Sequence, residues 1–291
     1  MGEAAGRASA APSGEPATVP SMPSRSAGGG DRNSAAAKAE RAEEHLVDLK
    51  RALDKWLGRH PYTLVTSEPA PSPSNRYAAE AKVWVNSVEP VPDKVGIVLG
   101  DLLGNLRAAL DHCAWRAACR HLGREPSGTE KASRVAFPIE GSAERFEKHA
   151  TVALVSDEAR DLMRACQPFP SHRSTRARHL AVLKNLVNVD KHREIHTAVG
   201  VVVSDPGPEV VVEGARHLGT LPGDEVLVPG SLVATILLGP ESLRPDSHFG
   251  VHAIPVEIRF GDEEDVTFTF ISEMRKTVNR LVLEFAPFFR P

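Results

Sequence analysis

Hydrophobic residues recur every three or four positions along several stretches of the chain, which is the spacing of one face of an α-helix. In the first of these stretches Leu46, Leu49, Leu53 and Trp56 form a single apolar stripe. Helices therefore dominate the first two thirds of the chain, and one more closes it. The predicted helices cover residues 34–58, 93–122, 143–149, 156–166, 174–193 and 272–289.

Elsewhere the hydrophobic period changes to two, which is the alternation of a β-strand. Ala81, Val83 and Val85 share one face, for example, and Gly-Pro, Pro-Gly and Gly-Asp steps separate the later strands. The predicted strands cover residues 62–67, 77–85, 201–204, 209–212, 225–228, 232–238, 251–260 and 266–270. The pattern predicts an α+β fold: a helical layer packed with a mostly antiparallel β-sheet meander, and a C-terminal helix.

The start of the chain differs in composition from the rest. Of the first 30 residues, 22 are Ala, Gly, Ser or Pro, and such a segment cannot bury enough apolar surface to offset the entropy of ordering it. We therefore expect a disordered tail over residues 1–33 and a single α+β domain over residues 34–291. Within that domain we expect a helical part at about 34–194, and the sheet with the final helix at about 195–291.

Charge and cysteine usage exclude several classes of protein. The chain has 35 basic and 38 acidic residues, so no strong overall field attracts nucleic acid or an acidic membrane. Its three cysteines lack C-x-x-C spacing, which argues against a disulfide framework and a cysteine zinc site. We find no signal peptide, no apolar run near the ~18 residues of a membrane span, and no phosphate-binding or nucleophile-elbow motif. We expect a cytoplasmic protein without membrane association or cofactor.

The helix predicted over residues 93–122 carries the first candidate site. Its leucines fill one side of a helical wheel, and polar residues form two strips on the opposite side. Asp101, Asn105 and His112 make the first strip, and Arg107 and Asp111 make the second. Charged residues are rarely buried unless they are paired, so the wide polar arc indicates either a network that specifies the fold or a site that lines a cleft.

Both interpretations of this helix stay open. In the structural one, the glycines repeated at i+4 from Gly96 to Gly104 let another backbone approach closely. Arg107 and Asp111 then form an i,i+4 pair, and His112 is a hydrogen-bonded structural histidine. In the functional one, Arg107 and His112 are catalytic residues at the edge of a cleft.

The helix predicted over residues 174–193 ends in the second candidate site. Asn185, Asn188 and His192 follow one another at i, i+3 and i+7. The cationic residues that follow also suit the C-terminal end of a helix dipole, so a solvated helix end is the alternative. Two helices packed through their leucines could bring both polar strips to one cleft edge. The predicted binding residues are Asp101, Asn105, Asp111, Asn188, Asp190, Lys191, His192 and Arg193.

Two shorter motifs accompany these helical ones. The full set is G-D-x-x-x-N-L-R-x-A-L-D-H at 100–112, F-P-I at 137–139, Q-P-F at 167–169 and N-x-D-K-H-R at 188–193. Together they resemble a widespread, largely uncharacterised family of bacterial proteins, over about residues 35–290. The resemblance implies a shared fold and a bacterial origin, and it implies no activity. The family commonly has His where this chain has Gly104, which weakens position 104 as a ligand.

The spacing Arg107-x4-His112 also resembles, more weakly, the motif of HEPN domains, which are helical ribonuclease and nucleotide-binding modules. The resemblance implies that His112 acts on the ribose 2′-hydroxyl and that Arg107 stabilises the charge on the phosphorane. Residues five apart lie about 140° apart around a helix, so a homodimer would be needed to bring both to one phosphate. RNA or an anionic small ligand at a local site would be the partner.

A metal site is the third alternative. His112 and His192 with Asp101 or Asp190, and with His45 from the first helix, could supply ligands from separate helices. No H-E-x-x-H motif occurs, so we predict no metal ligands. The sequence therefore leaves open whether the protein is an enzyme. It favours a non-enzymatic binding or interaction protein, followed by a metal-independent ribonuclease or nucleotide-handling enzyme and then by a metal-dependent hydrolase.

Overall fold

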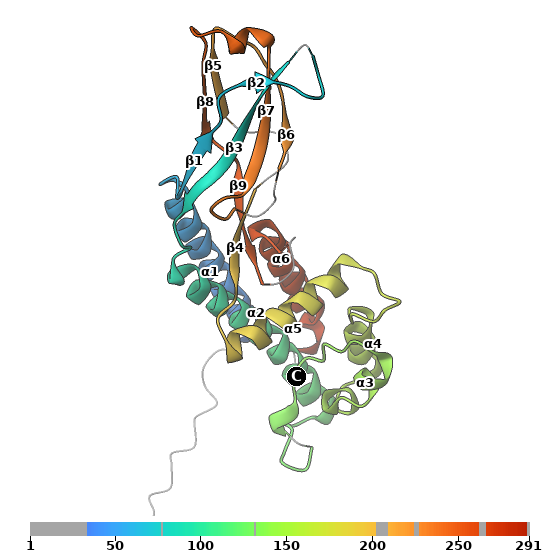
Figure 1. The fold of residues 1–291 in the computed structure, drawn as a ribbon. Helices are drawn as coiled ribbons and strands as arrows, with labels where there is room; N and C mark the ends of the chain where they lie inside the picture. The colour runs from blue at the N-terminus through green and yellow to red at the C-terminus, as the bar shows by residue number, and fades with distance from the viewer. Residues whose placement is uncertain are drawn as a thin grey trace, which may run out of the picture. The chain divides into compact units, whose positions relative to one another are not determined.

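The computed structural model describes residues 34–76, 78–130, 132–201, 209–223, 227–261 and 266–289. Every described residue belongs to one compact unit, Asn33–Pro291. The described residues build an α+β fold with a C-terminal helix (Figure 1), as the hydrophobic pattern predicts. The tail predicted over residues 1–33 lies outside the described residues.

The helices begin and end close to their predicted positions, because local signals terminate them. Gly123 follows α2 with a φ of 65°, the left-handed conformation that glycine adopts without strain. The hydroxyl of Ser174 caps α5 by accepting the N–H of Ala177. The helices are α1 (Ser34–Leu57), α2 (Asp93–Leu122), α3 (Ala143–Glu147), α4 (Asp157–Ala165), α5 (Thr175–His192) and α6 (Phe268–Glu284), with 3-10 turns η1 (Ala132–Arg134), η2 (Ala150–Leu154), η3 (Pro240–Leu243) and η4 (Ala286–Phe288).

All strand pairs are antiparallel, but they are not paired as a simple meander. The main sheet has the order β1-β3-β7-β6, with β2 on β3, and two further pairs join β4 to β9 and β5 to β8. The pairs β4–β9, β5–β8 and β6–β7 are thus nested as in one long hairpin. The strands are β1 (Tyr62–Thr66), β2 (Ala70–Pro71), β3 (Ala79–Val88), β4 (Thr197–Val201), β5 (Glu209–Glu213), β6 (His217–Pro222), β7 (Leu232–Leu238), β8 (His248–Ala253) and β9 (Val256–Phe260).

Three details of the prediction need correction. The strand predicted over 266–270 is wrong, because Thr267 caps α6 by accepting the N–H of Phe270. The strand predicted over 251–260 is divided between β8 and β9 at Pro255, which has no N–H for a sheet. Residues 202–204 and 225–226 of two further predicted strands, 201–204 and 225–228, lie outside the described residues, and Leu227 and Val228 belong to no strand.

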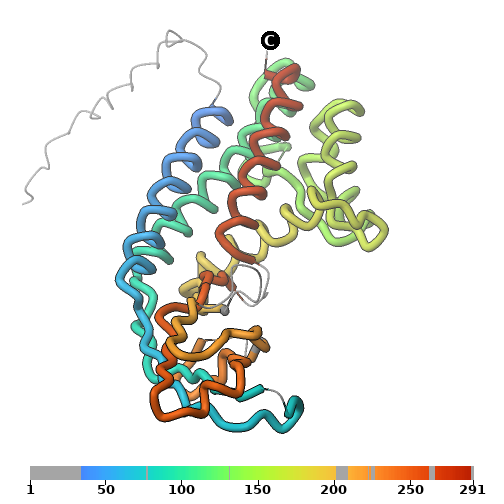
Figure 2. The backbone as a smooth tube through the Cα atoms, turned by 90° about the horizontal axis from the view of Figure 1, so that it is seen from above, coloured from blue at the N-terminus to red at the C-terminus, as the bar shows by residue number. Residues whose placement is uncertain are grey.

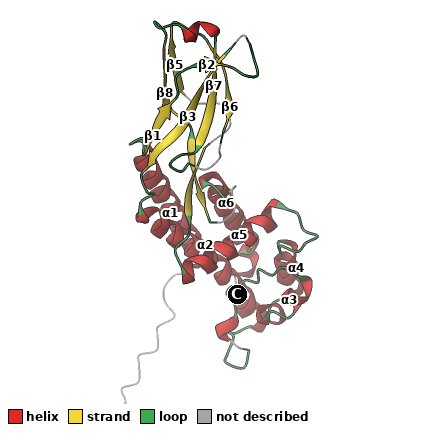
Figure 3. Ribbon diagram, in the orientation of Figure 1, coloured by secondary structure: helices red, strands yellow, loops and turns green. Residues whose placement is uncertain are grey.

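The proposed division into a helical part and a sheet part also needs correction. β1, β2 and β3 lie between α1 and α2 in the chain, and β3 pairs with β7 from the later part. The main sheet therefore contains strands from both sides of residue 194. Figure 3 shows the strands together at one end of the helices. At this end the chain leaves α1 for β1 and returns from β3 to α2.

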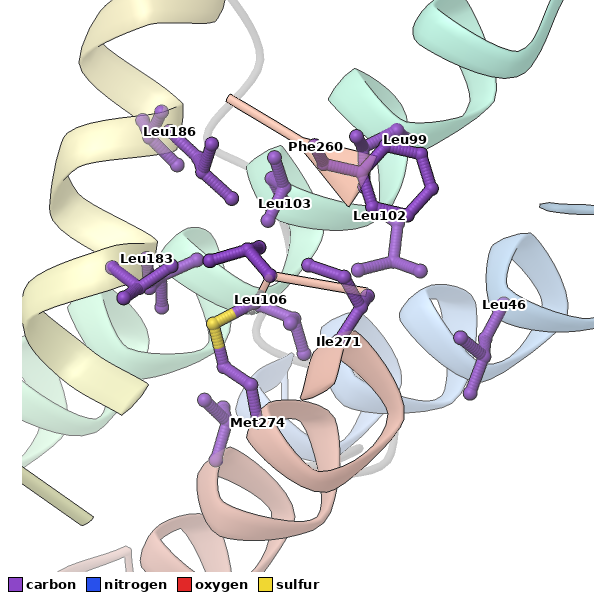
Figure 4. Close-up of a cluster of buried hydrophobic side chains, with 14 of the residues drawn as sticks. Leu46, Leu99, Leu102, Leu103, Leu106, Leu183, Leu186, Phe260, Ile271 and Met274 are labelled. Carbon is purple, nitrogen blue, oxygen red and sulfur yellow. The ribbon is translucent and has the colours of Figure 1, made fainter. Parts of the chain in front are cut away.

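The hydrophobic core lies where α1, α2, α5 and α6 pack together. Figure 2 shows α1, α2 and α6 side by side; these three helices contact one another, and α2 and α6 also contact α5. Within the described residues, no helix combines the length and apolarity that a membrane span requires. The predicted leucine ridge of α2 is confirmed, since its members are fully buried against residues of the other helices and of β9 (Figure 4). The ridge residues are Leu102, Leu103 and Leu106, which Figure 4 labels, and Leu110.

Candidate functional site

Arg107 and Asp111 of α2 together bind the backbone of Phe137. The Nη2 atom of Arg107 donates to the Phe137 carbonyl at 2.7 Å, and the Phe137 N–H donates to Oδ1 of Asp111 at 2.9 Å. The two side chains also pair directly, with 2.8 Å between Nη2 and Oδ1. The i,i+4 pair of the structural interpretation is therefore present, and it satisfies both backbone hydrogen-bonding groups of Phe137.

Other side chains hold the residues around Phe137 in the same way, and we call residues 136–140 the clamped segment. The Thr151 hydroxyl accepts the Ala136 N–H at 3.0 Å and donates to the Ala136 carbonyl at 2.7 Å. The Lys184 ammonium donates to the carbonyl of Ile139 at 2.6 Å. Side chains from η2, α2 and α5 thus supply hydrogen bonds that a helix or sheet would otherwise provide.

Gln167 completes the clamped segment from the end of α4. Its Nε2 donates to the carbonyls of Pro138 and Met163, both at 2.8 Å, and its Oε1 accepts the Glu140 N–H at 2.8 Å. Gln167 is fully buried, where an amide without partners would be costly. The polar residues around this segment therefore form a satisfied network that specifies the local fold.

His149 lies close to the charged side chains that surround the clamped segment. Burial lowers the pKa of its imidazole, and the positive charges of Arg107 and Lys184 also lower it, whereas Glu140 and Asp111 raise it. Its Nδ1 accepts the backbone N–H two residues later at 3.3 Å, which requires that nitrogen to carry no proton. His149 is thus a neutral structural histidine at pH 7.

The other polar strip of α2 does not join this network. Asn105 donates from Nδ2 to the carbonyl of Asp101 at 2.8 Å, so it bonds to its own helix. The Nδ1 atom of His112 is buried and has no hydrogen-bond partner in the part of the chain that the structure describes. The expectation of a hydrogen-bonded structural histidine is therefore wrong at this atom. Arg107 is bound to the clamped segment, whereas His112 makes no bond to it. The two residues of the Arg-x4-His spacing therefore do not act on one group.

A shallow groove of about 400 Å³ on α2 brings part of both motifs together. Asp190 of α5 lies directly over Gly100, because a Cβ placed on Gly100 would be 2.5 Å from the Oδ1 atom of Asp190. A Cβ on Gly96 or Gly104 would meet no atom within 4 Å. The predicted close approach of another backbone is therefore wrong at these glycines, and Gly100 accommodates a carboxylate. The groove is lined by Lys38, Ile97, Gly100, Asp101, Gly104, Asn105 and Asp190.

The two glycines offer a matched test of the contact between α2 and α5. We expect Gly104→Ala to raise the free energy of unfolding by about 0.5–1 kcal/mol, because alanine favours a helix interior. Gly100→Ala should gain clearly less, since its methyl group must displace the carboxylate of Asp190. Urea denaturation measures both changes, and equal gains would show that Asp190 does not rest on Gly100.

The remaining residues of the second motif separate into two groups. Asn188, Lys191 and His192 are exposed on α5, and among the described residues no hydrogen bond or ion pair joins them to α2. Arg193, which follows α5, lines a different cavity of about 750 Å³. Of the second motif, only Asp190 reaches the groove on α2. Asp190 is not part of the strip formed by Asn185, Asn188 and His192, so the prediction that the two strips meet at one cleft edge is wrong for the described residues.

This larger space, which we call the junction cavity, lies where α5, the start of α2 and strands β4 and β9 meet. Its walls expose apolar and polar surface in similar amounts. The apolar residues are Val182, Leu186, Val189, Ile195, Phe260 and Val266, and the polar residues include Asp93, Asn185, Arg193, Glu194 and His196.

No metal centre is formed by the residues considered for one. Within the described ranges, no group of three or more His, Cys, Asp or Glu residues is placed to hold a metal ion. His45, His112 and His192 therefore do not share a site with Asp101 or Asp190 there.

Comparison of the chain with protein-family models, with curated proteins and with solved structures finds no match. The resemblances to a bacterial family and to HEPN domains therefore stay predictions.

Three of the polar residues that hold the clamped segment were not predicted as site residues from the sequence. Thr151, Gln167 and Lys184 show no spacing that distinguishes them from surface residues. The one available signal was the Q-P-F motif at 167–169, in which a polar residue stands between the end of a predicted helix and a proline.

Proposed function

We propose that the protein is a non-enzymatic binding protein, in which the Arg107–Asp111 network specifies the fold and the junction cavity takes a small ligand. The junction cavity carries this proposal. Its volume of about 750 Å³ lies within the roughly 300–1,000 Å³ that is usual for small-molecule sites. Small-molecule sites combine apolar walls with polar groups that orient the ligand, and this cavity exposes both kinds of surface.

The lining indicates the chemical class of the ligand. The apolar side chains of α5 and β9, and that of Ile195 just before β4, would cover the apolar part of a ligand. Asp93, Arg193, Glu194 and His196 would meet its polar end. We therefore propose a small molecule with an apolar body and a polar group at one end.

The position of Arg107 supports a binding protein over a ribonuclease. A side chain that stabilises a phosphorane must reach the substrate. Arg107 instead directs Nη2 to Phe137 and Asp111, and its Nε donates to Asp111 Oδ2 at 3.2 Å. Turning Arg107 toward RNA would leave a partly buried carboxylate and a backbone carbonyl without their partner, which is costly. The metal-dependent hydrolase lacks a ligand set in the described part of the chain.

Binding of Nile red, an uncharged dye whose fluorescence rises in apolar surroundings, tests the junction cavity. Asn185 is exposed on α5 and lines this cavity, so Asn185→Trp should fill the space without disturbing the core. We expect this variant to bind the dye at least tenfold more weakly than the natural protein, with an unchanged melting temperature. Asn185→Ala is the matched control and should bind at least as well as the natural protein.

Two outcomes would contradict the proposed function. Equal dye binding by the natural protein and Asn185→Trp would remove the junction cavity as the ligand site. Cleavage of single-stranded RNA in the presence of EDTA, abolished in a folded His112→Ala variant, would show a metal-independent ribonuclease instead.

A further inference from the structure

A separate cavity of about 430 Å³ lies at the start of α5, and we call it the N-terminal cavity. Two arginines and two histidines line it together with Phe270 of α6. No Asp or Glu occurs among the described residues that line it. The lining side chains that can carry a positive charge are those of His172, Arg173, Arg178 and His179.

His179 is the buried polar group of this cavity, with only 4% of its surface exposed. Its Nδ1 bonds to the hydroxyl oxygen of Thr277 on α6 at 2.7 Å, and its ring meets Phe270 edge to face at 4.9 Å. Among the described residues the second ring nitrogen, Nε2, has no hydrogen-bond partner. These contacts fix the ring in a cavity wall with one nitrogen left for a ligand.

Arg178 and Glu273, two charged residues close to His179, each have a partner of their own. The guanidinium of Arg178 lies 5.0 Å from the ring centroid of Phe270, in a cation–π contact. The carboxylate of Glu273, the acidic group beside His179, pairs with Lys276 at 2.6 Å. A carboxylate that already has a cationic partner neutralises the cavity only weakly.

A second carboxylate near the start of α5 is paired as well. Glu284 of α6 accepts two hydrogen bonds from Arg176, at 2.6 and 2.8 Å. This carboxylate is therefore already neutralised by Arg176.

Backbone amides add to this positive field. The Ser174 hydroxyl accepts the N–H of Ala177 at 3.1 Å, while the first amides of a helix, here those of Thr175 and Arg176, have no acceptor within the helix. Such amides and the helix dipole favour an anion. We propose that the N-terminal cavity binds the phosphate group of a small phosphate monoester, whose organic part lies against Phe270.

Isothermal titration calorimetry at low ionic strength tests this site with phenyl phosphate, inorganic phosphate and phenol. We expect phenyl phosphate to bind more tightly than inorganic phosphate, because it also covers Phe270, and we expect no measurable binding of phenol. The double variant Arg173→Gln, Arg178→Gln should bind phenyl phosphate at least tenfold more weakly. Arg145→Gln removes an exposed arginine that does not line the cavity, and it should change the affinity less than twofold.

A titration of His179 by nuclear magnetic resonance gives a second readout. Burial and the charge of Arg178 lower the pKa of this imidazole, while Glu273 raises it. A bound phosphate dianion should raise the pKa of His179, because it stabilises the protonated ring. The double variant should lose this shift even if its fold is intact by circular dichroism.

Three results would overturn the phosphate site. They are unchanged affinity in the double variant, equal binding of phenol and phenyl phosphate, and a His179 pKa that does not respond to phenyl phosphate. The site is also separable from the proposed function, because Asn185→Trp should leave phenyl phosphate binding unchanged.

Discussion

We expect Asp111→Ala to lower the free energy of unfolding by about 2–4 kcal/mol, because it removes one partner from two polar groups at once. The guanidinium of Arg107 and the N–H of Phe137 both lose their acceptor. The side chains of Arg107 and Asp111 are only 21% and 32% exposed, so water replaces the lost contacts incompletely. Urea denaturation followed by circular dichroism measures the change.

Asp101→Ala is the matched control for this prediction, since Asp101 is an exposed aspartate on the same helix. Its expected effect is within about 0.5 kcal/mol. Arg107→Ala combined with Asp111→Ala should cost less than the sum of the single changes, because both act on Phe137. If the two losses of unfolding free energy were additive, Arg107 and Asp111 would hold Phe137 independently of each other.

Gln167→Met should lower the free energy of unfolding by roughly 3 kcal/mol, because a side chain of similar size leaves buried backbone groups without partners. The Glu140 N–H and the carbonyls of Pro138 and Met163 lose their hydrogen bonds. Amide hydrogen exchange locates the effect within the protein.

The exchange experiment contains its own control in the clamped segment. Glu140 should lose protection in Gln167→Met, whereas Phe137 should keep more of its protection because Asp111 still holds its N–H. Unchanged protection at Glu140 would show that Gln167 does not hold the segment.

The helices were predictable from sequence because the signals that form them are local. The buried side of α2 is predicted by the spacing of Leu102, Leu103 and Leu106, and the end of α2 is predicted by Gly123. The strand pairing was not predictable, because alternation shows which residues of a strand share a face and not which strand lies beside it. The alternation over 77–85 identifies β3, but its pairing with β7 is set by packing between distant parts of the chain.

The candidate site divides in the same way. The spacing of Arg107 and Asp111 predicts that they pair on one helix, and they do. Their common target, Phe137, lies in a segment without regular structure, so no periodic pattern points to it. Gln167 and His179 are polar residues whose burial follows only from the packing of several helices.

The position of β3 in the main sheet has a consequence for synthesis of the protein. β3 pairs with β1 on one side and with β7 on the other, and about half of the chain separates the end of β3 from the start of β7. At roughly 5–20 residues per second on the ribosome, one edge of β3 therefore waits about 7–30 seconds for its partner. An unpaired strand edge is a template for pairing with other chains. The nascent protein is thus most prone to aggregate before Leu238 at the end of β7 has emerged.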